Sequence, residues 1–387
     1  MASRLIPRPD TASGDLRFVS ILRLLARQTA VDFCCEEEPP SPNAPEEHYL
    51  ERLEADGIGI IGCGTEAYSK AVQSRAYSCL FVEFWTHARL TVPYMRRVQP
   101  WASIVVDSVD VHFLREAAAA RLGLLDEQGV AERKARELSV YRLADEVIVV
   151  SAEDEASLRA EGGVDRIRRI PNVTVPRARS LHTRDPILVF VGGFQHLPNR
   201  DAAIWLVEEI LPRVREAVPA ATVRIVGHSP PPDVVALGNR AGVEVVGFVP
   251  DVGPYLDTAA VSVAPLRYGA GMKGKVTQAM AAGTPVVATS FGAEGLGAEA
   301  GRHLVVADSA VDFSNAVIRC LRDPQWAAQI GLEGQRHIEG VCGESAVARA
   351  LEKLVAERAL IVPWYAGVGL SAYRTARRVA KTVGLKP

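Results

Sequence analysis

Short runs of apolar, mostly β-branched residues alternate with helix-length segments along most of the chain. The strand-like runs lie near residues 30–34, 58–61, 79–82, 103–106, 146–150, 167–170, 187–191, 223–226, 243–246, 261–264, 286–289 and 303–307. Continuous apolar runs of this length are typical of strands buried on both faces, and strands that alternate with helices form parallel β-α units. The sequence therefore predicts an α/β protein with doubly wound, Rossmann-like sheets.

The alternation is interrupted once, at residues 173–186, which are polar and contain arginines and prolines. We interpret this stretch as a linker, because 387 residues suffice for two domains of ordinary size. The predicted domains cover residues 1–180 and 181–345, with a helical extension over residues 346–387. Two such domains would face one another across a cleft.

Two details of the first domain are predicted from local signals. Residues 1–15 resemble the loop that follows a β-strand, yet at most Met1–Ser3 precede it, so the first strand is expected to be missing or to lie upstream. Residues 113–143 are predicted to form one long helical stretch.

Composition excludes several classes of protein. The net charge of −2 argues against a general nucleic-acid binder, which needs a basic face. The six cysteines have no CxxC spacing and predict reduced thiols without a zinc site. There is no signal peptide and no apolar run long enough to cross a bilayer. A cytoplasmic protein is the expectation.

The C-terminal stretch 361–387 allows two interpretations. Its first part is apolar and its second part carries arginines and lysines but no acid. Such a stretch can bind an anionic membrane surface, which would make the protein peripheral on the inner face of the membrane. The alternative is a terminal helix packed on the first domain.

A glycine-rich loop with two lysines follows the strand at residues 261–264. Gly269 and Gly271 allow a close backbone approach to a ligand, and Lys273 and Lys275 lie where a helix over residues 274–282 should begin. A helix N-terminus and ammonium groups both favour a phosphate. Gln278, one helical turn after Lys275, projects to the same side. The loop therefore predicts a site for a phosphate-bearing ligand.

A second cluster of polar residues follows the strand at residues 103–106. It contains Asp107, Asp110 and His112, with Arg115 one turn further along. Ligands of parallel sheets bind at such strand ends, and a histidine there can donate to a sugar hydroxyl or transfer a proton. The alternatives are that the acids cap the next helix, or that Asp107, Asp110 and His112 hold a metal.

A third motif, Gly62–Ala67, matches the GxGxxA dinucleotide pattern. It follows a predicted strand, opens a helix and has Glu83 about twenty residues further on. The motif does not lie in the first β-α unit of the chain, its usual position, so a tight turn is the preferred interpretation. NAD binding by an oxidoreductase is kept as an alternative.

The stretch from Val191 to Leu296 resembles the retaining glycosyltransferases of family 4. The similarity runs through VGGFQHLPNRDAAIWLVEEILPRV, VRIVGH and VEVVGFVPDVGPYLDTAAVSVAPLRYGAGMKGKVTQAMAAGTPVVATSFGAEGL, and more loosely through PRPDTASGDLR and DSVDVHFLRE in the first half. The resemblance implies the GT-B fold. It also implies transfer of a sugar from a nucleotide diphosphate sugar to a glycan or lipid-linked acceptor, with retention and without a bound metal or other cofactor. Surface polysaccharide or glycoconjugate synthesis is the role that it suggests.

The resemblance also assigns roles by position. Lys275, with Lys273 beside it, and the Gly192–Gly193 turn are expected to hold the donor diphosphate. Ser13 and Gly14 correspond to the small-residue loop of the first domain that approaches the same phosphates. His112 corresponds to the histidine that contacts the transferred sugar, and we expect Asp107, Asp110 and Arg115 to contact sugar or acceptor nearby.

The chain departs from the family pattern in the lysine loop. Many members have two glutamates eight residues apart, where this chain has Ala270 and Gln278. A glutamine oxygen accepts a hydrogen bond from a ribose hydroxyl more weakly than a carboxylate does. In this loop the chain resembles a branch of the family with GAGxKGKxxQ in place of the glutamates, so activity is expected. A nucleotide-sugar epimerase of the same fold and an inactive nucleotide-sugar-binding protein remain alternatives.

Overall fold

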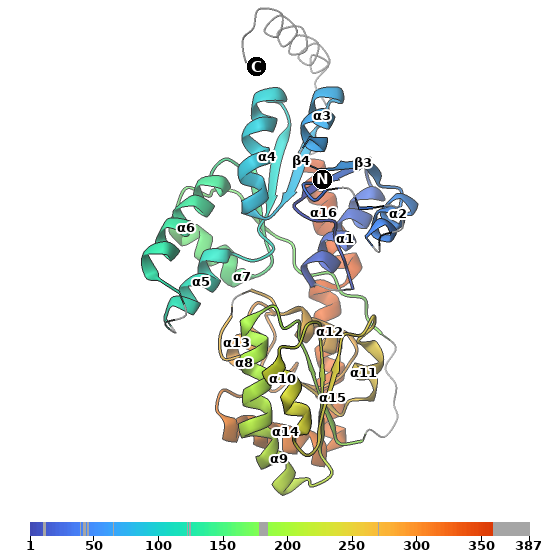
Figure 1. Cartoon of the computed structure of the whole chain (residues 1–387), viewed down its shortest axis with the longest axis vertical. Helices are drawn as coiled ribbons and strands as arrows, with labels where there is room; N and C mark the ends of the chain where they lie inside the picture. The colour runs from blue at the N-terminus through green and yellow to red at the C-terminus, as the bar shows by residue number, and fades with distance from the viewer. Residues whose placement is uncertain are drawn as a thin grey trace, which may run out of the picture.

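The computed structural model consists of two parallel α/β domains stacked end to end (Figure 1). It describes residues 1–358 except for residues 11–12, 39, 42–43, 45, 65, 122, 124, 178–184 and 270. The predicted stretch 361–387 therefore lies outside the described residues. No described helix is both long enough and apolar enough to cross a membrane.

The first domain is built on a seven-stranded parallel sheet with the order β3-β2-β1-β4-β5-β6-β7. Its strands are β1 (Ala2–Ser3), β2 (Asp32–Cys35), β3 (Gly59–Cys63), β4 (Cys79–Glu83), β5 (Ser103–Asp107), β6 (Glu146–Val149) and β7 (Ile167–Arg169). Its helices are α1 (Ser13–Ala26), α2 (Glu47–Ala55), α3 (Ala67–Ser74), α4 (Trp85–Val98), α5 (His112–Arg121), α6 (Glu127–Tyr141) and α7 (Ala152–Glu161).

Two expectations for this domain were wrong. The first strand is present, since Ala2–Ser3 pairs in parallel with both β2 and β4, but two residues are too few to give a readable pattern. The stretch over residues 113–143 is broken into α5 and α6. Gly123 adopts a positive φ of 71°, and Asp126 begins α6 by accepting a hydrogen bond from the Gly129 N–H.

The second domain has a six-stranded parallel sheet with the order β10-β9-β8-β11-β12-β13. Its strands are β8 (Ile187–Val191), β9 (Thr222–Val226), β10 (Val243–Gly247), β11 (Val261–Ala264), β12 (Val286–Ala288) and β13 (Val305–Val306). Its helices are α8 (Leu197–Trp205), the π-helical turn η1 (Leu206–Ile210), α9 (Leu211–Ala217), α10 (Pro232–Ala236), the 3₁₀ turn η2 (Leu237–Asn239), α11 (Gly253–Thr258), α12 (Gly274–Ala281), α13 (Ser290–Ala293), α14 (Ala310–Arg322) and α15 (Pro324–Cys342).

Each sheet is covered by helices on both faces. In the first domain α1 and α16 (Glu344–Arg358) pack on one face, and α3, α4 and α6 pack on the other. In the second domain η1, α9 and α14 cover one face, and α11, α12 and α15 cover the other. Burial on both faces explains why the strands are continuously apolar.

The C-terminal helix α16 returns to the first domain (Figure 1). Val347, Leu351 and Leu354 are buried in the first domain's core, and Arg358 forms an ion pair with Glu146 of β6 at 2.6 Å. The described part of the predicted extension is therefore built into the first domain. The chain crosses between domains twice, and the crossings meet at a bridge between Thr174 and Gly343.

The strand order argues against the dinucleotide interpretation of Gly62–Ala67. In a dinucleotide-binding unit the acid that bonds the ribose lies at the end of the strand beside the glycine turn. Here β2 and β1 separate β3 from β4, which carries Glu83, and that carboxyl is buried. Glu83 is therefore not placed to serve this turn.

Candidate active site

The lysine loop joins β11 to α12 and lies at the boundary between the domains. As predicted, Gly269 and Gly271 adopt positive φ values, 143° and 69°, which residues with a Cβ rarely adopt. A Cβ on Gly271 would lie 3.5 Å from the Cβ of Asp110 in the first domain. Gly271 therefore brings the loop backbone against the polar cluster that follows β5.

Lys275 lies between the end of β8 and the start of α12. Its Nζ donates a hydrogen bond to Oδ1 of Asn199 and lies 4.8 Å from the centre of the Phe190 ring. Asn199 is itself fixed, because its Nδ2 donates to the Gly193 carbonyl at 2.6 Å. A Cβ on Gly192 would approach the Lys275 Nζ to 3.1 Å. The ammonium group is thus held directly beside the Gly192–Gly193 turn, as the sequence predicted.

Burial, together with the smaller effect of the positive charge of Lys273, lowers the pKa of Lys275 to about 7. Near neutral pH a substantial fraction of Lys275 is therefore uncharged while no anion is bound. A diphosphate placed beside it would favour the ammonium form and raise its pKa. Binding of an anion should accordingly be coupled to proton uptake.

We expect the affinity for a nucleoside diphosphate to fall as pH rises from 7.5 to 9. The phosphates are already fully ionised in this range, so the proton taken up on binding goes to Lys275. Uptake of one proton lowers the affinity by up to about tenfold for each unit of rising pH. Calorimetry in buffers of different ionisation enthalpy would measure the proton uptake. Lys275→Arg, whose guanidinium stays protonated, should flatten the profile. An unchanged slope in this variant would assign the titration to another group.

Lys273 has a different environment from Lys275. Its Nζ donates to the carbonyl of Gly271 and lies 3.3 Å from Oε2 of Glu294. Burial lowers its pKa, against the opposing effect of Glu294. Lys273 is therefore already bonded to the Gly271 carbonyl and paired with the carboxylate of Glu294, whereas Lys275 is bonded to the neutral amide of Asn199. The two lysines, both predicted to hold the diphosphate, thus differ in whether an acidic side chain is paired with them.

His112 is the centre of the polar cluster on the first domain. Its Nδ1 accepts a hydrogen bond from the Trp85 indole at 3.1 Å, and its Nε2 lies 3.0 Å from Oδ1 of Asp110. Because the indole can only donate, Nε2 carries the proton in the neutral ring. His112 is consequently oriented as a hydrogen-bond donor at Nε2.

Asp110 binds His112 with one oxygen and Arg115 with the other. Burial acts to raise the pKa of Asp110, but the hydrogen bond from His112 and the positive charge of Arg115 outweigh it and lower the pKa. Asp110 is therefore ionised at neutral pH. Asp110, His112 and Arg115 come together as predicted.

Asp107 does not belong to this surface. It is fully buried and forms an ion pair with the equally buried Arg17, which also donates to the Ile170 carbonyl at 2.8 Å. The expectation that Asp107 contacts sugar or acceptor is wrong, because its carboxylate is buried and already paired with Arg17.

The N-terminus of α5 is capped by a residue that the sequence did not suggest. The backbone N–H groups of His112 and Phe113 donate to the Glu137 carboxylate at 3.0 and 2.9 Å, and Tyr141 donates to it at 2.8 Å. Glu137 lies on α6, so no local pattern links it to α5. Glu137, and not Asp110, therefore caps α5, so the alternative interpretation of Asp110 as a helix cap does not hold.

The remaining predicted residues lie around these two clusters. A Cβ on Gly14 would lie 3.6 Å from Val109, so the start of α1 lies next to the Asp110 loop. Ser13 is the first residue of α1, and its side chain lies outside the described residues. Gln278 is partly exposed on α12 and forms no side-chain hydrogen bond to the described residues.

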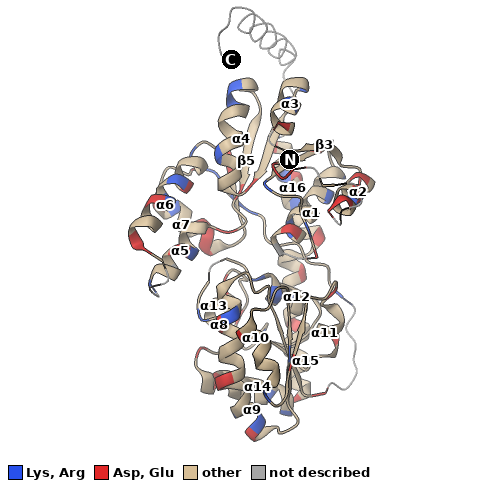
Figure 2. Cartoon of the chain, in the orientation of Figure 1, with Lys and Arg blue, Asp and Glu red and all other residues tan. Residues whose placement is uncertain are grey.

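Three further residues near the clusters were missed. Asn199 binds Lys275, as described above. His196 precedes α8, and its pKa is lowered by burial and by the charges of Arg115 and Lys275. Asp154 on α7 is buried, and burial together with the charges of Asp110 and Glu294 raises its pKa to about 6. His196 and Asp154 belong to different domains, so both domains contribute titratable groups near the clusters. Figure 2 shows residues of both charge signs on the elements that border the domain boundary.

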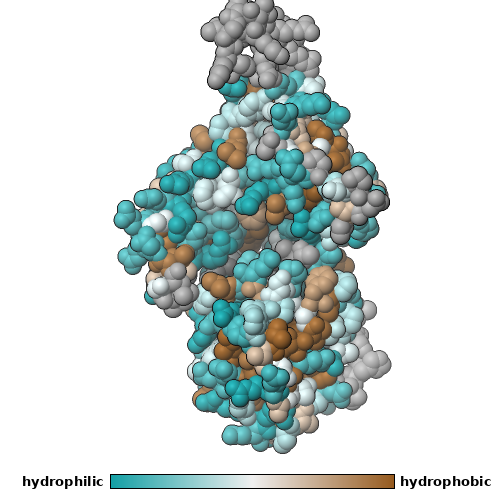
Figure 3. Space-filling view, in the orientation of Figure 1, coloured by the Kyte–Doolittle hydropathy of each residue, from teal (hydrophilic) through white to brown (hydrophobic). Residues whose placement is uncertain are grey.

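An aromatic pair lies at the ends of β9 and β10. The rings of His228 and Phe248 meet edge to face at 6.1 Å, and Phe248 is 48% exposed. The His228 carbonyl accepts a hydrogen bond from the Phe194 N–H at 3.0 Å, which ties the pair to the Gly193 turn. Figure 3 shows apolar surface between α10 and α11 on this domain and a recess between the two domains.

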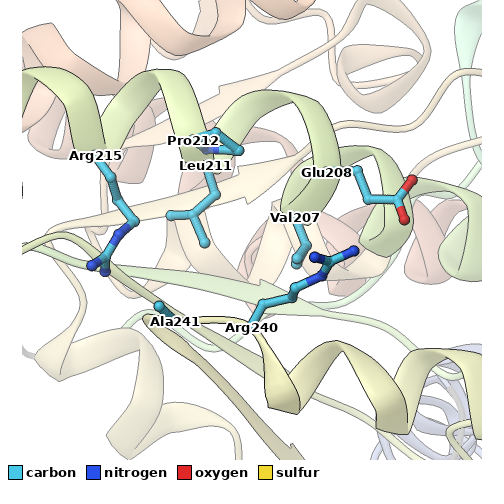
Figure 4. Close-up of a pocket in the computed structure, with 7 residues that line it drawn as sticks. All are labelled: Val207, Glu208, Leu211, Pro212, Arg215, Arg240 and Ala241. Carbon is cyan, nitrogen blue, oxygen red and sulfur yellow. The ribbon is translucent and has the colours of Figure 1, made fainter.

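A separate cavity of about 380 Å³ lies elsewhere on the second domain (Figure 4). It is lined by Val207, Glu208, Leu211, Pro212, Arg215, Arg240 and Ala241. None of the predicted site residues lines it. Among the residues that the structure describes, no three His, Cys, Asp or Glu side chains are placed to hold a metal ion.

Comparison with known proteins identifies the second domain. Residues 185–323 match the family described as Glycosyl transferases group 1. The chain is 28% identical over 278 residues to a D-inositol 3-phosphate glycosyltransferase of Streptomyces avermitilis, covering 62% of this chain and 58% of that protein. It is 24% identical over 276 residues to the Rhodococcus opacus protein of the same name, covering 62% of this chain and 60% of that protein. The matched stretch thus spans less than two thirds of either relative.

Solved structures resemble both domains together. A sucrose-phosphate synthase from Thermosynechococcus elongatus has a TM-score of 0.70 at 20% identity, covering 92% of this chain and 98% of that one. Anabaena Alr3699/HepE in complex with UDP-glucose has a TM-score of 0.70 at 14% identity, with the same coverage. Residues 185–323 thus match the glycosyl transferases group 1, and the chain has a GT-B-like fold of two parallel α/β domains.

Proposed function

We propose that the chain is a retaining glycosyltransferase that moves a sugar from a nucleotide diphosphate sugar to a glycan or lipid-linked acceptor. The observation that carries this proposal is the placement of Lys275. Asn199 holds its ammonium group beside Gly192, and the lysine loop meets the loop of Asp110 and His112 across the domain boundary. An anionic diphosphate fits the first cluster, and a sugar fits the second.

The chemistry follows from these charges. As the nucleoside diphosphate leaves, negative charge grows on its β-phosphate, and Lys275 with the main-chain N–H groups of the Gly193 turn and of α12 would stabilise it. The sugar carbon becomes positively charged, and the ionised Asp110 offsets that charge. His112 would donate from Nε2 to a sugar oxygen once its bond to Asp110 opens.

The donor is expected to lie along the strand ends of the second domain. With the diphosphate at Lys275, the base would reach the His228–Phe248 pair, whose exposed ring offers a stacking surface. Gln278 would accept from the ribose hydroxyls, and Ser13 and Gly14 would approach the phosphates from the first domain. UDP is the first nucleotide to test, since the similar Anabaena structure contains UDP-glucose.

The acid-rich stretch over residues 36–47, which follows β2 in the sequence, would help choose the acceptor. A role in surface polysaccharide or glycoconjugate synthesis at the inner membrane surface would fit the basic stretch 361–387. The resemblance to the family supports the same role.

The test is a thermal-shift panel of UDP, GDP, ADP, dTDP and NAD. One nucleoside diphosphate at about 100 times its Kd should raise the Tm by about 5 °C, and NAD should leave it unchanged. Incubation with the matching nucleotide sugar then separates the alternatives. An epimerase would convert the donor with no acceptor, an inactive protein would bind without turnover, and stabilisation by NAD alone would contradict the proposal.

A further inference from the structure

The backbone is strained at the ends of two neighbouring strands of the first domain. Phe84, directly after β4, has φ 61° and ψ 137°, and Val109, just after β5, has φ 59°. Aromatic and β-branched residues avoid positive φ, because the Cβ collides with the backbone. Strain of this kind persists where the surrounding structure imposes it, and it clusters at functional sites.

Hydrogen bonds and packing hold Phe84 in this conformation. Its N–H donates to the Asp107 carbonyl at 2.8 Å, and its carbonyl accepts from the Ala88 N–H at 3.0 Å as α4 begins. The next residue, Trp85, is buried and donates its indole N–H to His112. The strained turn thus fixes two successive aromatic residues at once.

The result is that His112 is flanked by two aromatic rings. The Phe84 ring lies 5.7 Å from the imidazole centre at 49°, and the Trp85 ring lies 6.3 Å away at 76°. Trp85 is enclosed in the domain core, whereas Phe84 stays partly exposed. Core packing therefore explains Trp85 but does not explain why the fold tolerates strain at Phe84.

We propose that Phe84 is a positioning residue whose ring supports the apolar face of the donor's transferred sugar beside His112. This inference rests on the proposed function. The Asp110 loop touches Gly271 of the lysine loop, and both Asp110 and Lys275 act electrostatically on His196, so the Phe84–His112 surface and the diphosphate proposed at Lys275 would share one side of the domain boundary. The C–H groups of a pyranose face pack on an aromatic ring, while its hydroxyls reach His112, Asp110 and Arg115.

The experiment compares a nucleotide with its sugar conjugate by calorimetry. The probes are UDP and UDP-glucose, or the diphosphate that the panel selects and its glucose conjugate. Phe84→Ala should leave the Kd of the nucleotide within about twofold and weaken the sugar conjugate about three- to tenfold. Phe84→Tyr should restore the wild-type ratio. Phe291→Ala, which removes another partly exposed phenylalanine, is the matched control and should change neither Kd.

A second variant tests the strain itself. Phe84→Gly removes the ring but suits a positive φ, so its Tm should exceed that of Phe84→Ala while its sugar affinity is equally weak. A merely structural role would lower the affinity for nucleotide and conjugate together, and that result would overturn the inference. An unchanged ratio of the two Kd values in Phe84→Ala would also overturn it. Failure of wild type to bind any nucleotide would instead remove the proposed function itself.

Discussion

Replacement of Lys275 by methionine is expected to weaken nucleoside diphosphate binding at least about 100-fold at pH 7. The ammonium group is the cation that the structure holds beside the Gly192 turn, and loss of one partner from an enclosed charge pair costs about 2–5 kcal/mol. Methionine keeps the length and apolar stem of the side chain. Calorimetry with the nucleotide selected by the panel would measure the change.

Stability measurements separate this effect from a folding defect. Because the folded protein lowers the pKa of Lys275 from its ordinary value to about 7, the fold disfavours the ammonium form. Below pH 7 this effect lowers the free energy of unfolding by its full amount. As pH rises from about 7 towards the ordinary lysine pKa, the effect disappears and the free energy of unfolding increases. Lys275→Met removes that penalty but leaves Oδ1 of Asn199 without its donor, so the two effects oppose one another.

We therefore expect the Tm of ligand-free Lys275→Met at pH 7 to stay within a few degrees of wild type. Lys353→Met, on the exposed side of α16, is the matched control and should change neither binding nor pH dependence. Wild-type affinity in Lys275→Met would show that the diphosphate binds elsewhere. A Tm far below wild type would mean that Lys275 acts in folding.

Replacement of His112 by alanine is expected to reduce donor turnover by about 100-fold or more. A positioned proton donor typically contributes 10²- to 10⁴-fold, and Trp85 and Asp110 orient the Nε2 proton of His112 for that role. The Kd of the nucleoside diphosphate should change by less than about threefold, because the phosphate cluster lies on the other domain. The assay is release of nucleoside diphosphate from the donor, with Kd measured separately.

The control for this prediction is His48→Ala, which removes an exposed histidine from α2. It should leave turnover and Kd unchanged. Asp110→Asn is expected to lower turnover as well, since the amide cannot offset positive charge on the sugar. Equal losses of turnover and nucleotide affinity in His112→Ala would contradict the proposal that the second domain binds the diphosphate while His112 of the first domain acts on the sugar.

Much of the fold could be predicted because local patterns determine it. The strand predicted over residues 187–191 matches β8 residue for residue, and the helix predicted over residues 274–282 matches α12 to within one residue. Periodicity and turn residues act over short distances, so they remain readable in sequence. The predictions failed where local signals are weak, at the two-residue strand β1 and at the break between α5 and α6.

The candidate site was predictable in part for the same reason. Gly271 and Lys275 stand out because a strand, a glycine loop and a helix follow one another in sequence. Asp107 and Asp110 looked equivalent, yet Arg17 of α1 neutralises the first and leaves the second at the surface. Likewise Glu294 pairs with Lys273 and not with Lys275.

The sequence by itself determined the alternation of strands and helices and the resemblance of the second domain to the glycosyl transferases group 1, and it predicted a phosphate site at the Lys275 loop. Only the tertiary structure decided which charged groups remain available. It placed Asn199 on Lys275, Glu137 at the start of α5, and α16 in the core of the first domain. Such pairings join segments that are far apart in the chain. They depend on how the sheets and helices pack, which no local pattern of residues records.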